Sequence, residues 1–123
     1  NLARVSVGIP TYQNEAGLAY LKLGDIKNGE RILSKVIMSS PLNYDAHNYL
    51  ASGYEVHGEY KKAIKERLAL LNLDPLNYEN YFQLIKNYKA LGDDKAAINV
   101  VNELSNSDYL NKYAKEASAL AQS

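Results

Sequence analysis

The amino-acid sequence repeats at a fixed interval. Gly24, Gly58 and Gly92 are each separated by 34 residues. Other residue types keep the same register, namely Tyr20, Tyr54 and Tyr88, then Leu42, Leu76 and Leu110, then Asn43, Asn77 and Asn111, and Pro41 and Pro75. A period of about 34 residues is typical of stacked helix–turn–helix units. Such units bury their apolar surface between neighbouring repeats, so the 123-residue chain does not need one central core.

The residues between these markers have helical spacing. In residues 44–57, for example, His47, Leu50, Ala51 and Tyr54 recur at intervals of three and four and define one helical face. Gly58 follows, and glycine suits the left-handed conformation that often ends a helix. The same pattern in each unit predicts three helix pairs and a terminal helix, over residues 11–23 and 26–38, 44–57 and 60–73, 78–91 and 94–104, and 108–122.

Proline and short polar side chains are predicted to mark the helix ends. Pro75 has no amide hydrogen and clashes with the preceding turn, so the helix before it must stop. Asn77 and Asp93 are predicted to cap the helices that follow them, because their side chains can accept hydrogen bonds from free backbone amides. Asp108 is predicted to cap the last helix in the same way. Residues 1–9 are expected to be either a linker or the end of a preceding element.

With these markers, the chain resembles the tetratricopeptide repeat family. Its second unit matches the family's pattern at His47, Leu50, Ala51, Tyr54, Gly58, Ala63, Leu70 and Pro75. The resemblance implies an all-α fold, a right-handed solenoid of about three helix pairs with a C-terminal capping helix. Residues 10–123 would form this domain, with repeats at about 10–43, 44–77 and 78–111 and the cap at about 109–122. Tyr20, Tyr54 and Tyr88 would fill the space between paired helices. Arg67 in place of an aromatic residue and Gly29 in place of alanine would loosen the local packing.

Composition restricts the possible functions. The 14 basic and 14 acidic residues give a net charge of zero, whereas nucleic-acid binding needs a basic excess or a basic face. His47 and His57 are isolated, there is no cysteine, and no catalytic motif is visible, so we expect no enzyme activity, cofactor or metal site. No apolar run is long enough to insert in a membrane. Because the chain begins at Asn1, we expect a soluble segment of a longer protein, in the cytoplasm or the periplasm. The oligomeric state is left open.

The repeat register also predicts a binding surface. In helix-pair solenoids the first helix of each pair lines the concave side, where extended partners commonly bind. The predicted groove comprises three rows of residues that lie 34 positions apart, and two flanking residues. The first row is Asn14, Asn48 and Phe82, the second is Leu18, Ser52 and Lys86, and the third is Leu21, Glu55 and Lys89. The flanking residues are Tyr49 and Gln83. We expect a protein or peptide partner with apolar side chains near the first repeat and acidic groups near Lys86 and Lys89. The alternative is that Leu18 and Phe82 pack against neighbouring helices.

Two functional classes fit these observations. The first is a protein-interaction module that binds a partner segment in the groove. Some tetratricopeptide domains bind the C-terminal carboxylate of chaperones with basic side chains, in a carboxylate clamp. This chain lacks basic residues at the matching positions, so we do not expect that function. The matching positions are Asn14, Leu18, Tyr49, Glu79 and Gln83. The second is an accessory domain of a larger protein. Residues 73–81 and 91–93 are similar to repeats at the C-terminal end of some bacterial membrane-bound O-antigen polymerase or ligase proteins.

Overall fold

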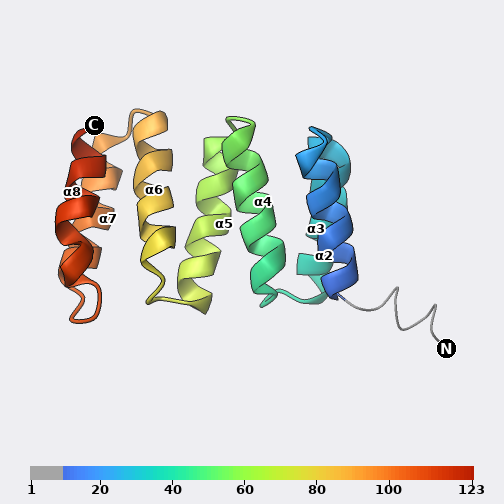
Figure 1. The fold of residues 1–123 in the computed structure, drawn as a ribbon, viewed down its shortest axis with the longest axis horizontal. Helices are drawn as coiled ribbons and strands as arrows, with labels where there is room; N and C mark the ends of the chain where they lie inside the picture. The colour runs from blue at the N-terminus through green and yellow to red at the C-terminus, as the bar shows by residue number, and fades with distance from the viewer. Residues whose placement is uncertain (1–9) are drawn as a thin grey trace. The chain divides into compact units, whose positions relative to one another are not determined.

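The computed structural model describes residues 10–123, with side chains from Tyr12 onward, and it is helical throughout (Figure 1). Seven α-helices and one short 3-10 helix follow one another, and this part of the chain contains no strand. They are α2 (Pro10–Lys22), α3 (Ile26–Ser39), α4 (Tyr44–Val56), α5 (Tyr60–Leu73), α6 (Tyr78–Ala90), α7 (Asp94–Ser105), η1 (Asn111–Tyr113) and α8 (Ala114–Gln122). The predicted all-α helical repeat is confirmed, and the first six helices begin and end within one residue of the predicted positions.

The three glycines of the repeat end their helices in the same way. Gly24, Gly58 and Gly92 have φ values of 84°, 75° and 79°, in the left-handed region that favours glycine. The residue after each glycine donates a backbone hydrogen bond to the carbonyl of the repeat tyrosine, over 2.9, 2.8 and 2.9 Å in chain order. This pattern is the Schellman motif, so the period in the sequence corresponds to a repeated helix-ending turn.

Two of the three predicted caps are confirmed. The side chain of Asn77 accepts a hydrogen bond from the amide of Glu79, and that of Asp93 accepts one from the amide of Ala96. The prediction that Asp108 caps the last helix is wrong, because α8 begins only at Ala114. The Ser107 hydroxyl accepts hydrogen bonds from the next amides instead, at 3.3 Å from Tyr109 N and 3.2 Å from Leu110 N. This turn and η1 occupy the segment where a continuous helix was expected.

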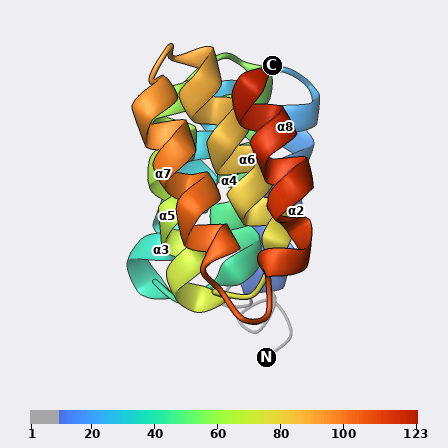
Figure 2. The same cartoon turned by 90° about the vertical axis from the view of Figure 1, so that its left-hand side faces the viewer.

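The helices form two compact units. Unit 1 ends at Glu59 and contains α2, α3 and α4, each of which packs against the other two. Unit 2 spans Tyr60–Ser123 and contains α5 to α8. Within unit 2, α6 contacts α5, α7 and α8, and α8 also packs against α7 (Figures 1 and 2). The boundary falls between α4 and α5, inside the predicted second repeat; the repeat boundaries themselves stay a prediction.

Glycines allow the helices of unit 1 to approach closely. A Cβ atom at Gly29 would lie 2.6 Å from Leu21 Cδ2, and one at Gly53 would lie 2.8 Å from Leu21 Cδ1. Gly29 therefore does not loosen the packing as expected; it makes room for Leu21. The Leu21 side chain is only 7% exposed, so most of it lies in the core; its predicted contact with a partner in the groove stays a prediction. Its main role is to fill the core between α2, α3 and α4.

Buried polar groups in unit 2 are hydrogen-bonded. Arg67 of α5 is 6% exposed and donates a hydrogen bond to Oδ1 of Asn80 on α6, over 3.0 Å. The expectation that Arg67 loosens the packing is therefore wrong, because its guanidinium replaces an aromatic contact by a hydrogen bond between two helices. Around α6 and α7 lies an apolar core that includes Leu84, Ile85, Ala97 and Leu104, all fully buried.

The repeat tyrosines differ in burial. Tyr54 is 7% exposed and donates a hydrogen bond to the carboxylate of Glu30 on α3. Tyr88 is half-buried, whereas Tyr20 is 36% exposed, so the expectation of a core role fails at Tyr20. The hydrogen-bond partner of Tyr54 lies 24 residues earlier in the chain, on the preceding helix. The three tyrosines therefore share a register position but not the same burial.

Candidate functional site

Four of the predicted groove residues line a pocket in unit 1. The pocket has a volume of about 280 Å³ and lies between α2 and α4. It is lined by Leu18, Leu21 and Lys22 of α2 and by Tyr49, Ser52, Gly53 and Val56 of α4. On each helix the spacing of three and four places these residues on one face. We call this site the α2–α4 pocket.

The α4 side of the α2–α4 pocket includes two small residues, Ser52 and Gly53. Leu21 takes the space that a side chain at Gly53 would need, whereas Ser52 is a short side chain in the lining of the pocket. The floor is Leu21, which is fixed in the core, and the rim includes Val56, which is 83% exposed. Sequence reasoning missed Lys22, Gly53 and Val56. The consecutive small residues Ser52 and Gly53 were the signal that could have indicated the pocket.

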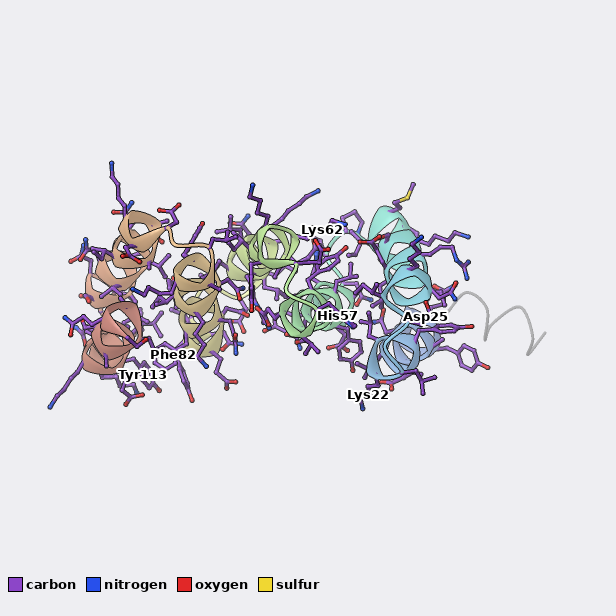
Figure 3. All side chains as sticks on the ribbon, turned by 90° about the horizontal axis from the view of Figure 1, so that it is seen from above. Lys22, Asp25, His57, Lys62, Phe82 and Tyr113 are labelled. Atoms are coloured by element: carbon purple, nitrogen blue, oxygen red, sulfur yellow. The ribbon has the colours of Figure 1, made fainter. Side chains whose placement is uncertain are left out.

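Polar groups border this apolar space. The Tyr49 hydroxyl donates a hydrogen bond to Oε1 of Glu15, over 3.4 Å, between equivalent positions of α2 and α4. Burial of the Tyr49 ring raises the pKa of its phenol, and the nearby carboxylates of Glu15 and Asp45 raise it further. Lys22 is exposed and lies on the side of α2 that is turned away from α3 (Figure 3). The rim therefore has a hydrogen-bonded Tyr–Glu pair and a separate ammonium group.

Asn14 has a structural role. Its side chain is 2% exposed, and its Nδ2 donates a hydrogen bond to Oδ1 of Asn43 over 2.9 Å. The same Asn43 oxygen caps α4 by accepting from the amide of Ala46. Asn14 Oδ1 is buried without a hydrogen-bond partner in the described part of the chain. The prediction that Asn14 binds the backbone of a partner is thus corrected: this buried side chain ties α2 to the start of α4. Asn48 and Glu55 are half-buried.

Phe82, in unit 2, belongs to an aromatic cluster. The rings of Tyr78 and Tyr113 stack with centroids 4.1 Å apart and planes 18° apart. Phe82 meets both rings edge-on, at centroid distances of 5.3 Å from Tyr78 and 6.3 Å from Tyr113. Figure 3 shows Phe82 and Tyr113 side by side. The alternative for Phe82, packing against a neighbouring helix, is therefore the one observed.

The other predicted positions in unit 2 remain polar. Gln83 is half-buried and Lys86 is exposed. Lys89, however, forms an ion pair with Asp94, with Nζ 3.0 Å from Oδ1. The contact of an acidic partner with both Lys86 and Lys89 stays a prediction, and Lys89 would have to exchange Asp94 for the partner.

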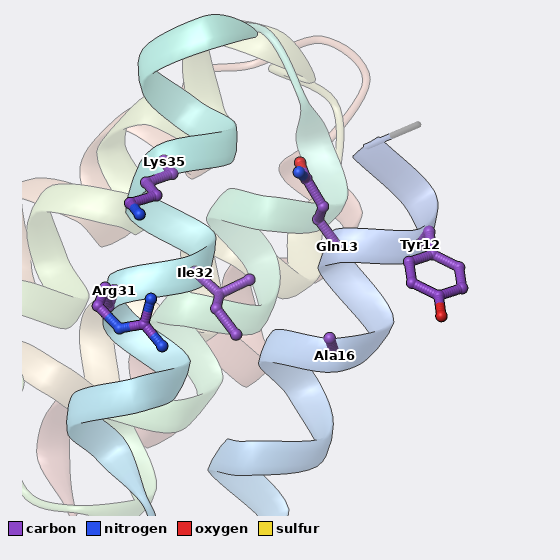
Figure 4. A pocket seen from close by; sticks show the side chains of 6 residues that line it. All are labelled: Tyr12, Gln13, Ala16, Arg31, Ile32 and Lys35. Carbon is purple, nitrogen blue, oxygen red and sulfur yellow. The ribbon is translucent and has the colours of Figure 1, made fainter. Parts of the chain in front are cut away.

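Two further pockets lie elsewhere in the units. One of about 320 Å³ lies between α2 and α3 of unit 1 and is lined by Tyr12, Gln13, Ala16, Arg31, Ile32 and Lys35 (Figure 4). The other, of about 280 Å³, lies between α7 and α8 of unit 2 and is lined by Ile98, Val101, Asn102, Ser118, Ala121 and Gln122. Neither contains a predicted groove residue.

The remaining side-chain chemistry is limited. Within residues 10–123, no cluster of three or more His, Cys, Asp or Glu side chains could hold a metal ion. His47 is buried, and its ring Nε2 lies 2.8 Å from the carbonyl oxygen of Pro41, whereas His57 is exposed. Among the described helices, none has the combined length and apolar character that a membrane span requires.

Comparisons with known proteins show the fold. No protein-family model matches the chain, and a search of curated proteins finds no match. Similar solved structures include MamA AMB-1, with a TM-score of 0.69 and 19% sequence identity over 91% of this chain and 60% of that chain. A MamA D159K mutant matches with a TM-score of 0.68 and 20% identity, over 94% of this chain and 72% of that chain. MamA MSR-1 matches with a TM-score of 0.67 and 18% identity, over 94% of this chain and 79% of that chain.

These neighbours define a class of fold. They are helical-repeat structures of the tetratricopeptide-like type, and the chain shares that architecture. The chain spans about 60% of the length of MamA AMB-1.

Proposed function

We propose that the chain is a tetratricopeptide repeat protein or domain that acts as a non-catalytic protein-interaction module. It would bind a peptide or partner segment on the first helices of its repeats. The observation that carries this proposal is the α2–α4 pocket, an open apolar site formed by Leu18, Leu21, Tyr49 and Ser52 at positions that the repeat register had singled out. Apolar surface left open on a folded domain is commonly a site for a partner.

The composition supports a protein or peptide partner. With equal numbers of acidic and basic residues, the chain lacks the charge excess that drives phosphate binding. The α2–α4 pocket has a volume of about 280 Å³ and is lined mostly by apolar residues. Its size suits one or two side chains of a polypeptide. Fold neighbours of the tetratricopeptide-like type agree with such a role without identifying the partner.

An accessory role within a larger protein is the second candidate. It is favoured by the similarity of residues 73–81 to repeats of membrane-bound O-antigen polymerase or ligase proteins. In that case the partner segment would belong to the same polypeptide. Many transmembrane helices encoded upstream of Asn1 would favour this candidate over a free-standing module.

Affinity purification followed by surface mapping tests the proposal. The folded chain would be used to isolate partners from its source cells, and a purified partner would then be bound to it for hydrogen-exchange mass spectrometry. We expect protection from exchange on α2, α4 or α6. Protection confined to α3, α5 and α7, or the lack of any partner that binds stoichiometrically, would contradict the proposal.

A further inference from the structure

The α2–α4 pocket lies where α4 carries two consecutive small residues, Ser52 and Gly53. One repeat earlier in the register, the positions of Ser52 and Gly53 are occupied by Leu18 and Ala19. Leucine at position 18 shows that this position of the repeat accepts a large apolar side chain. The short side chain of Ser52 therefore leaves a space that a leucine at this position would take, while the space at Gly53 is taken by Leu21.

The protein does not fill this space with its own side chains. Leu21 forms the floor, and it is fixed between Gly29 and Gly53, where added Cβ atoms would lie 2.6 and 2.8 Å from it. A swing of Leu21 into the pocket would leave a void in the core of unit 1, which is costly. A closed apolar cavity of about 150 Å³ already accepts benzene, so a space of about 280 Å³ has room for a leucine or phenylalanine side chain.

One charged group borders the pocket. Among the described residues of its lining, Lys22 is the one with a charged side chain, and it makes no ion pair within residues 10–123. Glu15 is engaged by the Tyr49 hydroxyl at the other end of the site. An anionic group in a ligand would thus find an open ammonium group beside the apolar space.

We infer that the α2–α4 pocket binds one bulky aliphatic or aromatic side chain of a partner peptide that carries Asp or Glu one or two residues away. The carboxylate pairs with Lys22 while the apolar side chain rests on Leu21 between Leu18 and Ser52. This inference rests on the proposed function, because it assumes that the first helices bind a partner, and it specifies the chemistry of one contact.

The acidic group belongs to a side chain within the segment and not to a chain terminus. Lys22 lies in the last turn of α2, where the free backbone groups are carbonyls that carry partial negative charge. Capture of a terminal carboxylate usually relies on backbone N–H groups, which this end of the helix lacks. A flexible Asp or Glu side chain can meet the ammonium group in solvent, away from those carbonyls.

Apolar burial should contribute more to affinity than the ion pair. Burying a leucine-sized side chain is worth about 1.5–3 kcal/mol, which corresponds to roughly a tenfold to hundredfold change in affinity. The ammonium of Lys22 is exposed, so its pairing should change affinity by only a few-fold and should weaken with salt.

The inference is tested by nuclear magnetic resonance with synthetic peptides. Short glycine- and serine-based peptides would carry a Leu-Ser-Asp segment, the same segment with Ala for Leu, the same with Lys for Asp, or Leu as a free C-terminus. They would be titrated into the isotope-labelled chain to millimolar concentrations. The Leu-Ser-Asp peptide should shift the amides of Leu18, Ser52 and Gly53 and should bind about tenfold more tightly than the Ala peptide. The Lys peptide should bind a few-fold more weakly. Tighter binding of the C-terminal leucine peptide would overturn the assignment of the acidic group.

Matched variants complete the test. Ser52→Leu should fill the pocket and abolish peptide binding, whereas Ser52→Ala should retain it. Lys22→Glu should reverse the preference between the Asp and Lys peptides, and Lys35→Glu on α3 should leave it unchanged. Each variant must first give the amide spectrum of a folded chain. If folded Ser52→Leu binds the peptide as the parent does, the inference is wrong. If a purified partner still protects α2, α4 or α6 from exchange in that variant, the proposed function survives this failure; if no partner binds the parent chain, both are wrong.

Discussion

The two units present similar helix contacts with different side chains. In unit 1 the first helix α2 packs against the first helix of the next pair, α4, and in unit 2 α6 packs against α8. Tyr78, Phe82 and Tyr113 close the face between α6 and α8 with stacked rings. Two periods earlier, Phe82 and Tyr113 correspond to Asn14 and Asp45. The contact between α2 and α4 is therefore polar near Asn14 and Asp45, and the α2–α4 pocket lies further along the same two helices.

This difference shows that the residues that set the helix ends and the residues that form the surface of the helices vary independently. The regular spacing of the glycine turns and the helix caps determines where the helices begin and end, and this spacing is the same in both units. The residues that face outward from the first helices do not repeat, and they decide whether a contact is closed or open. A binding site can thus arise in one unit by exchanging a few side chains without a change of backbone.

The largest expected effect concerns the anchor tyrosines of the repeat. Tyr54→Ala should lower the free energy of unfolding by roughly 3–5 kcal/mol, because it removes a buried ring and leaves the Glu30 carboxylate without its hydroxyl donor. Tyr20→Ala at the equivalent but exposed position should cost much less. Urea unfolding of both variants measures the difference. Equal losses would show that the difference in burial between these two tyrosines does not affect stability.

The sequence was sufficient to predict most of the fold because its signals are local. Helical spacing, the left-handed glycines and the caps Asn77 and Asp93 each depend on residues within one turn of the chain. The last helix was misplaced because two adjacent residues, Ser107 and Asp108, could each bind free amides, and only the structure shows that Ser107 does. Burial could not be predicted equally well, since it depends on which side chains of other helices pack against each residue.

The candidate site was predicted only in part. The register grouped Leu18, Tyr49 and Ser52, and these residues line one pocket, because matching faces of stacked helices lie side by side; their contact with a partner stays a prediction. It could not show that Asn14 would be held by Asn43, since that contact joins a helix to a cap 29 residues away. Nor could it show that Tyr113 covers Phe82, because the start of α8 departs from the repeat.

The aromatic cluster of unit 2 is expected to stabilise the packing of α6 against the start of α8. Tyr113→Ser removes the ring that stacks on Tyr78 and covers Phe82, and it should cost about 2 kcal/mol, since aromatic pairs add about 0.5–1.5 kcal/mol each beyond the area that they bury. Tyr109→Ser is the matched control, because Tyr109 is 73% exposed and should contribute little. Thermal or urea unfolding would measure both. Equal stabilities of the two variants would mean that the cluster does not stabilise unit 2.

Overpacking the glycines of unit 1 should have a smaller effect. Gly29→Ala places a Cβ atom 2.6 Å from Leu21 Cδ2 and 3.1 Å from the carbonyl of Gly17, so neither neighbour can easily yield. We expect a loss of about 1–2 kcal/mol, because overpacking costs about 1–3 kcal/mol and the helix gains up to about 1 kcal/mol when alanine replaces glycine. The three atoms nearest to a Cβ at Gly53 all belong to the Leu21 side chain, so Gly53→Ala should cost less. Adding Leu21→Val should recover part of either loss, as urea unfolding can show. A stabilised Gly29→Ala variant would contradict this account of the core.

The smallest expected effect is a loss of stability at alkaline pH that differs between the units. Burial raises the pKa of Tyr49 in unit 1 and of Tyr81 and Tyr88 in unit 2. Nearby carboxylates raise each pKa further. The carboxylates of Glu15 and Asp45 act on Tyr49. The carboxylate of Glu103 acts on Tyr81 and Tyr88, and that of Asp93 also acts on Tyr88. The unfolded chain ionises its tyrosines near pH 10, whereas the folded chain keeps these phenolic protons to higher pH. Stability from the three groups is thus fully present below about pH 10 and is lost as the pH rises through their raised pKa values.

Matched phenylalanine variants would separate this effect from the titration of lysines in the same range. The double variant Tyr81→Phe and Tyr88→Phe should lose less stability than the parent chain between neutral pH and a pH above about 10. Tyr49→Phe should reduce the loss less, because it removes one raised pKa instead of two. Glu15→Gln should reduce the loss less than Tyr49→Phe does. It removes one carboxylate that raises the pKa of Tyr49 but keeps the burial of the ring, which is the larger cause. Urea unfolding at the two pH values measures each loss. If the double variant and the parent lose equal stability, the burial of the two α6 tyrosines is not coupled to folding as the structure implies.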